Sequence, residues 1–114
     1  MKSIIKDGAA QLGLEISELQ INQLIKYAQL LKEWNEKMNL TAIKDDEGIA
    51  VKHFLDSMTA ISTGKIGGTV IDVGTGAGFP GLVLKIMKPE IKLTLLDSLN
   101  KRITFLKAVA EELG

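Results

Sequence analysis

The chain has 114 residues, with fourteen basic and fourteen acidic side chains, one histidine and no cysteine. The balanced charge argues against a surface dedicated to clamping nucleic acid, and the missing cysteines exclude disulfides and thiolate metal sites, so we expect no metal centre. A composition of 46% apolar and 25% charged residues is typical of one globular domain, or part of one. No apolar run approaches the ~20 residues of a membrane span and the start lacks a signal peptide, so we expect a cytoplasmic protein.

The first part of the chain is predicted to be helical. Residues 1–11 favour a short amphipathic helix that ends near Gly13. Ser17 and Gln20 have the spacing of a capping box, in which each side chain covers the backbone N–H of the other, so a long helix should follow. Its apolar residues recur with the 3.6-residue period of a helix that buries one face. They are Ile21, Leu24, Ile25, Tyr27, Ala28, Leu31 and Trp34.

A third helix is predicted over residues 47–59, where Asp45 and Asp46 can cap its start. The pattern then changes at the glycine-containing segment STGKIGG. We therefore place a boundary there, between a helical segment of residues 1–63 and a second part of residues 64–114.

The second part has the pattern β-α-β-α. Residues 70–73 and 93–96 are short runs, apolar on both faces, as is typical of parallel strands that are covered on both sides. Pro80 suits the first turn of a helix between them, because its missing N–H is one that the helix does not use. A last helix is predicted over residues 100–113, with Gly114 as its C-cap. The chain is therefore expected to be of the α/β class.

Glycines crowd the turn that follows the first predicted strand. The sequence TVIDVGTGAGFPG places them at Gly74, Gly76, Gly78 and Gly81. Each glycine costs roughly 0.5–1 kcal/mol relative to alanine, so we expect a ligand to pack against this bare backbone. Asp97 ends the second strand, about 20 residues further on, which is where an acid binds ribose hydroxyls in α/β nucleotide sites. Turn and acid are predicted to form one site.

Two ligand classes fit the turn. Gly76, Gly78 and Gly81 match the dinucleotide fingerprint, which would indicate a nicotinamide-dependent oxidoreductase. That fingerprint requires its first glycine directly after the strand, and here that glycine is Gly74. An acid at Asp72 followed by alternating glycines instead resembles motif I of the S-adenosylmethionine-dependent methyltransferases, whose turn cups the amino-acid end and ribose of the cofactor.

Three further residues have two interpretations each. His53 lies on a predicted helix, where we expect a packed or surface histidine rather than a catalytic one. Lys101 and Arg102 begin the last helix on the cofactor side of the sheet. They are placed to contact RNA phosphate, although a solvated helix face explains them better.

Four sequence blocks stand in order along the chain: WNxxxNLT from Trp34, HFLDS from His53, IDVGTGAGFPG from Ile71 and LLDSxxKR from Leu95. Together they resemble the GidB/RsmG family, bacterial methyltransferases that act on guanine N7 of 16S ribosomal RNA. The resemblance implies a Rossmann-like class I methyltransferase sheet, S-adenosyl-L-methionine as cofactor, and the small ribosomal subunit or its RNA as partner.

The resemblance also implies a set of cofactor-binding positions. Gly74 and Phe79 match the family's contacts in the turn, with Gly76, Gly78 and Asp97 as supporting members. It implies no catalytic acid or base, because guanine N7 carries no proton that would have to be removed.

The family's sheet has seven strands, whereas this chain reaches only the second. We therefore expect the N-terminal part of a methyltransferase, and a catalytically inactive folded fragment stays open as an alternative. A two-stranded sheet also leaves an unpaired apolar edge, which predicts self-association, a partner, or marginal stability of this piece alone.

Overall fold

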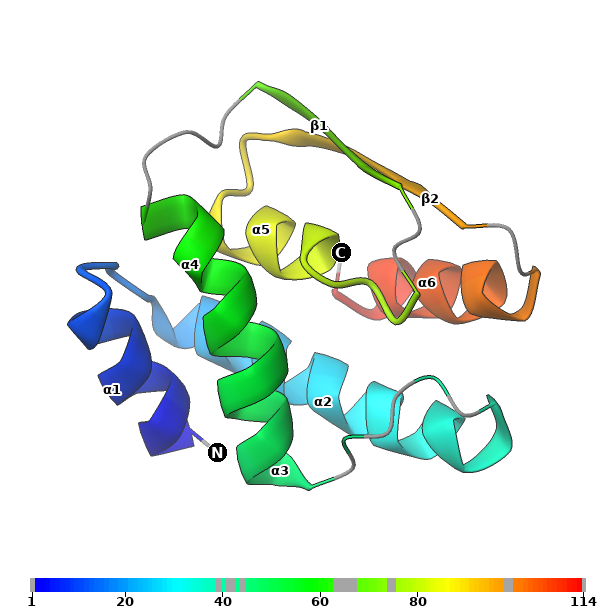
Figure 1. Cartoon of the computed structure of the whole chain (residues 1–114), viewed down its shortest axis with the longest axis horizontal. Coiled ribbons are helices and arrows are strands. Elements are labelled where there is room, and N and C mark those ends of the chain that lie inside the picture. The colour runs from blue at the N-terminus through cyan, green and yellow to red at the C-terminus, as the bar shows by residue number, and fades with distance from the viewer. Residues whose placement is uncertain are drawn as a thin grey trace.

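The chain begins with helices and ends with alternating strands and helices, as Figure 1 shows. The computed structural model describes residues 2–38, 40, 43, 45–62, 68–73, 76–97 and 100–113. In chain order the elements are α1 (Lys2–Gln11), α2 (Glu18–Met38), α3 (Asp46–Gly48), the π-helix η1 (Ile49–Leu55), α4 (Asp56–Ser62), β1 (Thr69–Val73), α5 (Gly81–Met87), β2 (Lys92–Leu96) and α6 (Asn100–Leu113). The predicted α/β class is confirmed, while the boundary at residue 63 and the cap at Gly114 lie outside the described residues.

The predicted capping box at the start of α2 is confirmed. The backbone N–H of Ser17 donates to Gln20 Oε1 over 2.9 Å, and that of Gln20 donates to Ser17 Oγ over 3.1 Å. Gly13 ends the preceding helix with a φ of +74°, a conformation that glycine adopts readily. Local sequence signals thus determine both sides of the connection between α1 and α2.

The third helical stretch starts where predicted but has a different hydrogen-bond pattern. Asp45 Oδ2 accepts the backbone N–H of Gly48 at 2.8 Å, as a capping acid should. The prediction of an α-helix over residues 47–59 is wrong in its middle, because residues 49–55 form the π-helix η1. Such wide turns are rare, and an apolar period alone does not distinguish them from α-helix.

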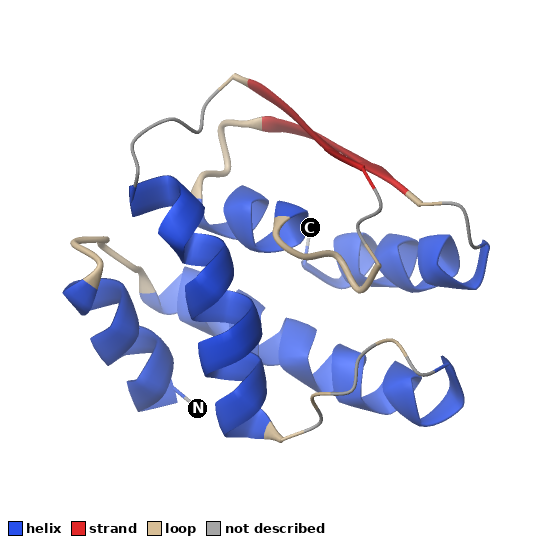
Figure 2. Ribbon diagram, viewed as in Figure 1, coloured by secondary structure: helices blue, strands red, loops and turns tan. Residues whose placement is uncertain are grey.

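The two strands pair in parallel, in register from Thr69 opposite Lys92 to Val73 opposite Leu96. Helix α5 connects them and packs on both, so that the sheet forms an outer layer over α5 in Figure 2. The expectation that both faces of the sheet are covered is wrong for the described part of the chain. Ile71 is 60% exposed and Leu96 48% exposed, because no described element packs on that face.

One hydrophobic cluster joins the two parts of the chain. The helical segment contributes Ile5, Leu24, Tyr27, Phe54 and Met58, and the second part contributes Val83, Ile86, Phe105 and Val109, among others. Burying each large apolar side chain contributes about 1.5–3 kcal/mol. The helical segment therefore packs against the β-α-β-α part and lies below the sheet in Figure 1.

Candidate functional site at the glycine turn

The structure brings the glycine turn and the acid at the end of β2 into contact. The parallel register places the carboxyl ends of both strands side by side. The backbone N–H of Gly76 donates to Asp97 Oδ2 over 2.8 Å. Residues that are 21 positions apart in the sequence thus meet at one edge of the sheet, as the spacing predicted.

The Asp97 carboxylate is buried in this arrangement. Its side chain is only 2% exposed, and Arg102 Nη1 on α6 lies 3.5 Å from the same oxygen, Oδ2. Asp97 therefore connects the turn, the end of β2 and the first turn of α6. The Arg102 side chain is 38% exposed and its guanidinium faces this carboxylate, a contact that neither of the two sequence interpretations predicted.

The backbone at Gly76 borders open space. Its φ is +59°, and a Cβ built on this residue meets no atom of the described residues within 4 Å, its chain neighbours aside. A left-handed conformation disfavours residues with side chains, which explains glycine here. The described residues thus leave open volume beside the backbone at Gly76.

Gly78 has a different reason to be glycine. A Cβ at this position falls 2.5 Å from the Tyr27 hydroxyl oxygen and 2.6 Å from Leu82 Cδ1, and φ is +100°. The space beside Gly78 is therefore filled by the protein's own side chains. Close packing of the turn against Tyr27 of α2 and Leu82 of α5 explains this glycine without a ligand.

Asp72, the acid of the glycine motif, supports the helix that follows the turn. Its Oδ2 accepts the backbone N–H of Gly81 at 3.1 Å, at the start of α5. This bond satisfies one of the donors that a helix start leaves without an intrahelical partner. The two strand-end acids thus hold opposite ends of the turn, Asp97 at Gly76 and Asp72 at Gly81.

Phe79 stacks on rings from the helical segment. The His53 ring lies parallel to it, with centroids 4.2 Å apart and an interplanar angle of 4°. The Tyr27 ring stacks on it at 5.2 Å and 17°. Neither helical residue was predicted to belong to the site. Tyr27 followed the apolar period of α2, so the pattern gave no signal beyond core packing, whereas the HFLDS block marked His53.

Burial changes the ionisation of both neighbours of Phe79. Tyr27 is fully buried and its hydroxyl donates to the carbonyl oxygen of Ala77. Burial raises the pKa of Tyr27 well above its usual value, and the negative charge of Asp72 adds to that rise. Burial lowers the pKa of His53, with the nearby charge of Asp56 opposing the change. Both rings are therefore favoured in their neutral forms, as aromatic packing requires.

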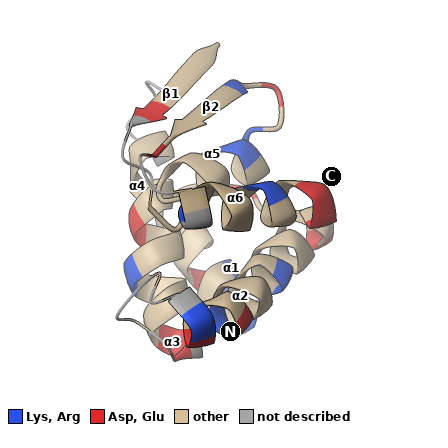
Figure 3. Ribbon diagram, turned by 90° about the vertical axis from the view of Figure 1, so that its right-hand side faces the viewer, with Lys and Arg blue, Asp and Glu red and all other residues tan. Residues whose placement is uncertain are grey.

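The remaining predicted positions are only partly described. Gly74 and the side chain of Lys101 lie outside the described residues. Basic and acidic residues are mixed along the helices on the side of the molecule that Figure 3 shows. That side therefore gives no indication of an RNA-binding face.

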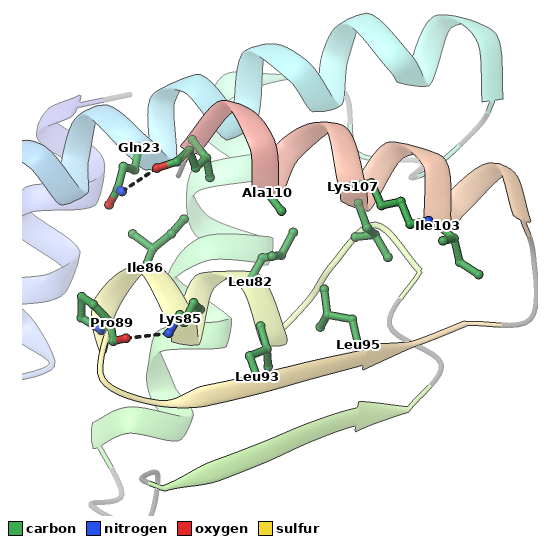
Figure 4. A pocket seen from close by; sticks show the side chains of 12 residues that line it. Gln23, Leu82, Lys85, Ile86, Pro89, Leu93, Leu95, Ile103, Lys107 and Ala110 are labelled. Carbon is green, nitrogen blue, oxygen red and sulfur yellow. Dashed lines mark hydrogen bonds between the residues drawn. The ribbon is translucent and has the colours of Figure 1, made fainter.

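An apolar cavity of about 460 Å³ lies between α5, β2 and α6. Figure 4 shows Leu82, Leu93 and Leu95 pointing into it, with Lys85 and Lys107 along its sides. None of the residues that line it belongs to the segment from Gly76 to Pro80 or is Asp97. The cavity is therefore separate from the glycine turn.

Within the described residues, no group of three or more histidine, cysteine, aspartate or glutamate side chains is arranged to hold a metal ion. Over the same residues, no helix combines the length and the apolar character needed to cross a membrane.

Comparison with known proteins gives one consistent family. The model of the GidB family, described as rRNA small subunit methyltransferase G, matches residues 20–114. A protein named ribosomal RNA small subunit methyltransferase G from Alkaliphilus metalliredigens is 59% identical over 99% of this chain and 48% of its own length. Proteins of that name from Alkaliphilus oremlandii and Exiguobacterium sibiricum are each 58% identical, over 98% and 92% of this chain and 48% and 45% of their own lengths.

The chain thus spans about half the length of the curated relatives it matches. The matched range contains the turn, Asp97, Tyr27 and His53. These findings confirm the resemblance that the four sequence blocks predicted. The chain belongs to the GidB family of small-subunit ribosomal RNA methyltransferases.

Proposed function

We propose that this chain binds S-adenosylmethionine at the turn after β1 and forms the N-terminal part of an enzyme that methylates guanine N7 of 16S ribosomal RNA. The relatives' name supports methylation of small-subunit ribosomal RNA, and the glycine motif supports the choice of cofactor. One observation carries the proposal: the Gly76 N–H is bound to Asp97, beside open space.

The residues at the turn fit this cofactor. The open volume at Gly76 leaves the backbone accessible to the amino-acid end of the ligand. A carboxylate has about four acceptor sites, so Asp97 is of a residue type that can accept a ribose hydroxyl while it also accepts the Gly76 N–H. Because the Asp97 side chain is 2% exposed, binding requires a local movement of the turn.

When bound, S-adenosylmethionine supplies a methyl group on a positively charged sulfur. The chain's own task is to bind, to orient and to exclude water, because guanine N7 has a free lone pair and no proton to remove. We assign no catalytic residue for this reason.

The site residues divide into two groups in this proposal. Gly76 and Asp97 face the cofactor, whereas Gly78 and Phe79 fix the turn through their contacts with the helices. Gly74 stays a predicted cofactor contact from the sequence motif. The division of the chain follows the same line, with residues 64–114 forming the cofactor part and residues 1–63 supporting it.

The proposal also names a partner and a location. An enzyme of this kind would act on the 16S RNA or the small ribosomal subunit, and would therefore work in the cytoplasm. Membership of a methyltransferase family disfavours the nicotinamide interpretation. The inactive-fragment interpretation predicts that no cofactor binds, and a binding measurement distinguishes it.

Thermal unfolding with added S-adenosylhomocysteine or NAD tests the proposal. A ligand at about one hundred times its Kd should add about 2.7 kcal/mol to the stability of the folded chain. We expect S-adenosylhomocysteine to raise the unfolding temperature and NAD to leave it unchanged. The absence of a shift with S-adenosylhomocysteine, or a shift with NAD instead, would contradict the proposal.

Two matched glycine substitutions locate the site. Gly76→Val should abolish the shift, because its side chain would enter the space beside the turn. Gly13→Val is the control, since Gly13 also has a positive φ and open surroundings but lies between α1 and α2. Each valine should cost on the order of 1–2 kcal/mol in backbone strain. Only Gly76→Val should remove the response to the ligand.

A further inference from the structure

The HFLDS block has no explanation in cofactor binding, although the structure places its histidine beside the turn. His53 lies on η1, and its ring is nearly parallel to that of Phe79, with the ring centroids 4.2 Å apart. Parallel ring contacts at this distance are attractive beyond the area that they bury. A residue 26 positions earlier in the sequence therefore packs directly on the turn.

The turn is held from the helices at two of its described positions. His53 and Tyr27 stack on Phe79, and the Tyr27 hydroxyl donates to the Ala77 carbonyl. Gly76, directly before Ala77, donates its backbone N–H to Asp97. The contacts from the helices thus fix Ala77 and Phe79, which follow Gly76 in the turn.

The backbone around His53 is itself unusual. It lies within the π-helix, and its carbonyl oxygen accepts the Ser57 hydroxyl at 2.6 Å. π-Helical turns occur frequently at functional sites, where they change the direction of a side chain relative to a regular helix. Both His53 and Ser57 belong to the HFLDS block. The first and last residues of the block are therefore hydrogen-bonded to each other beside the turn.

We propose that His53 is a positioning residue for the cofactor turn, and that it anchors the Phe79 end of the turn by stacking while the Gly76 end adjusts to the ligand. This inference rests on the proposed cofactor site. It assigns the helical segment a part in cofactor binding, because the imidazole connects η1 to the segment that carries Gly76.

Three variants separate positioning from simple packing. His53→Ala removes the ring, and His53→Phe keeps a flat ring that can stack on Phe79. Ile5→Val is the matched control, because Ile5 is fully buried in α1 and its shortening loosens the core away from the turn. Affinity for S-adenosylhomocysteine and amide hydrogen exchange at Gly76 and Phe79 are measured for each variant.

We expect His53→Ala to weaken S-adenosylhomocysteine binding by roughly 2- to 10-fold, which corresponds to the loss of one aromatic pair. The same variant should speed hydrogen exchange of the Gly76 amide, whose bond to Asp97 depends on the position of the turn. His53→Phe should restore both properties, and Ile5→Val should change neither.

Several results would overturn the inference. Unchanged exchange at Gly76 in His53→Ala would do so whether or not the ligand binds. Equal effects of His53→Ala and Ile5→Val would show that general loss of stability is the cause, and His53→Phe behaving like His53→Ala would exclude stacking. The proposed cofactor site fails separately, if the wild-type chain does not bind S-adenosylhomocysteine at all.

Discussion

At the scale of single residues, the glycine turn combines two kinds of requirement. Gly76 has a left-handed backbone beside open space, whereas Gly78 has a left-handed backbone whose surroundings are filled by Tyr27 and Leu82. Only the first is typical of a ligand site, because the second is explained by close packing. A run of alternating glycines therefore does not assign the same role to each of its members.

His53 should make the stability of the chain depend on pH. Its pKa is lowered in the folded protein by burial, while Asp56 opposes that change, so the unfolded chain binds the proton more tightly. The contribution is fully present above the ordinary histidine pKa of about 6.5 and is lost as the pH falls below it. We therefore predict that the free energy of unfolding decreases as the pH falls from about 7 through the ordinary histidine pKa of about 6.5.

Chemical unfolding at a series of pH values measures this effect. His53→Phe is the control, since His53 is the one histidine of the chain. Its stability should vary less over the same range. A wild-type chain whose stability rises as the pH falls would have the opposite sign and would refute the prediction.

At the scale of elements, one glutamine joins two helix ends. Gln20 completes the capping box of α2, and its Nε2 also donates to the carbonyl oxygens of Ile86 and Met87 over 3.2 Å each. These carbonyls belong to the last turn of α5. The start of the long helix is thus attached to the end of the crossover helix.

Two alanine substitutions separate these roles. Ser17→Ala removes only its own bond in the box and should cost about 1 kcal/mol. Gln20→Ala also removes the bonds to α5 and should cost about 1 kcal/mol more. Urea unfolding measures both, and equal costs would mean that the contact with α5 contributes nothing.

Local signals in the sequence predicted most element boundaries, but they did not predict the contacts between elements. The last helix begins and ends as predicted at residues 100–113, and the meeting of Gly76 with Asp97 follows from strand order and spacing. The π-helical turn and the stacking of His53 on Phe79 were not predicted. Both depend on contacts between segments distant in the sequence, which an apolar period does not encode.

At the scale of the whole molecule, the sheet remains open. Its two strands each have an unpaired edge in the described part of the chain, and Ile71 and Leu96 project from its outer face with 60% and 48% exposure. Unpaired edges beside exposed apolar side chains favour association. We therefore predict that this chain self-associates in solution through the sheet.

Sedimentation velocity over a range of concentrations tests self-association. Ile71→Lys should shift the population toward monomer, because it places a charge on the outer face of β1. Leu19→Lys is the matched control, since Leu19 on α2 is a similarly exposed apolar residue. A wild-type chain that stays monomeric, or equal effects of both lysines, would contradict the prediction.

The most direct test of the central claim is a titration of the ¹⁵N-labelled chain with S-adenosylhomocysteine, followed by NMR. Binding at the turn predicts saturable shifts at the amides of Gly76, Ala77 and Asp97, with no comparable change at Ile103 and Ala110 beside the apolar cavity. No shift at the turn, or shifts confined to the cavity, would contradict the placement of the cofactor after β1.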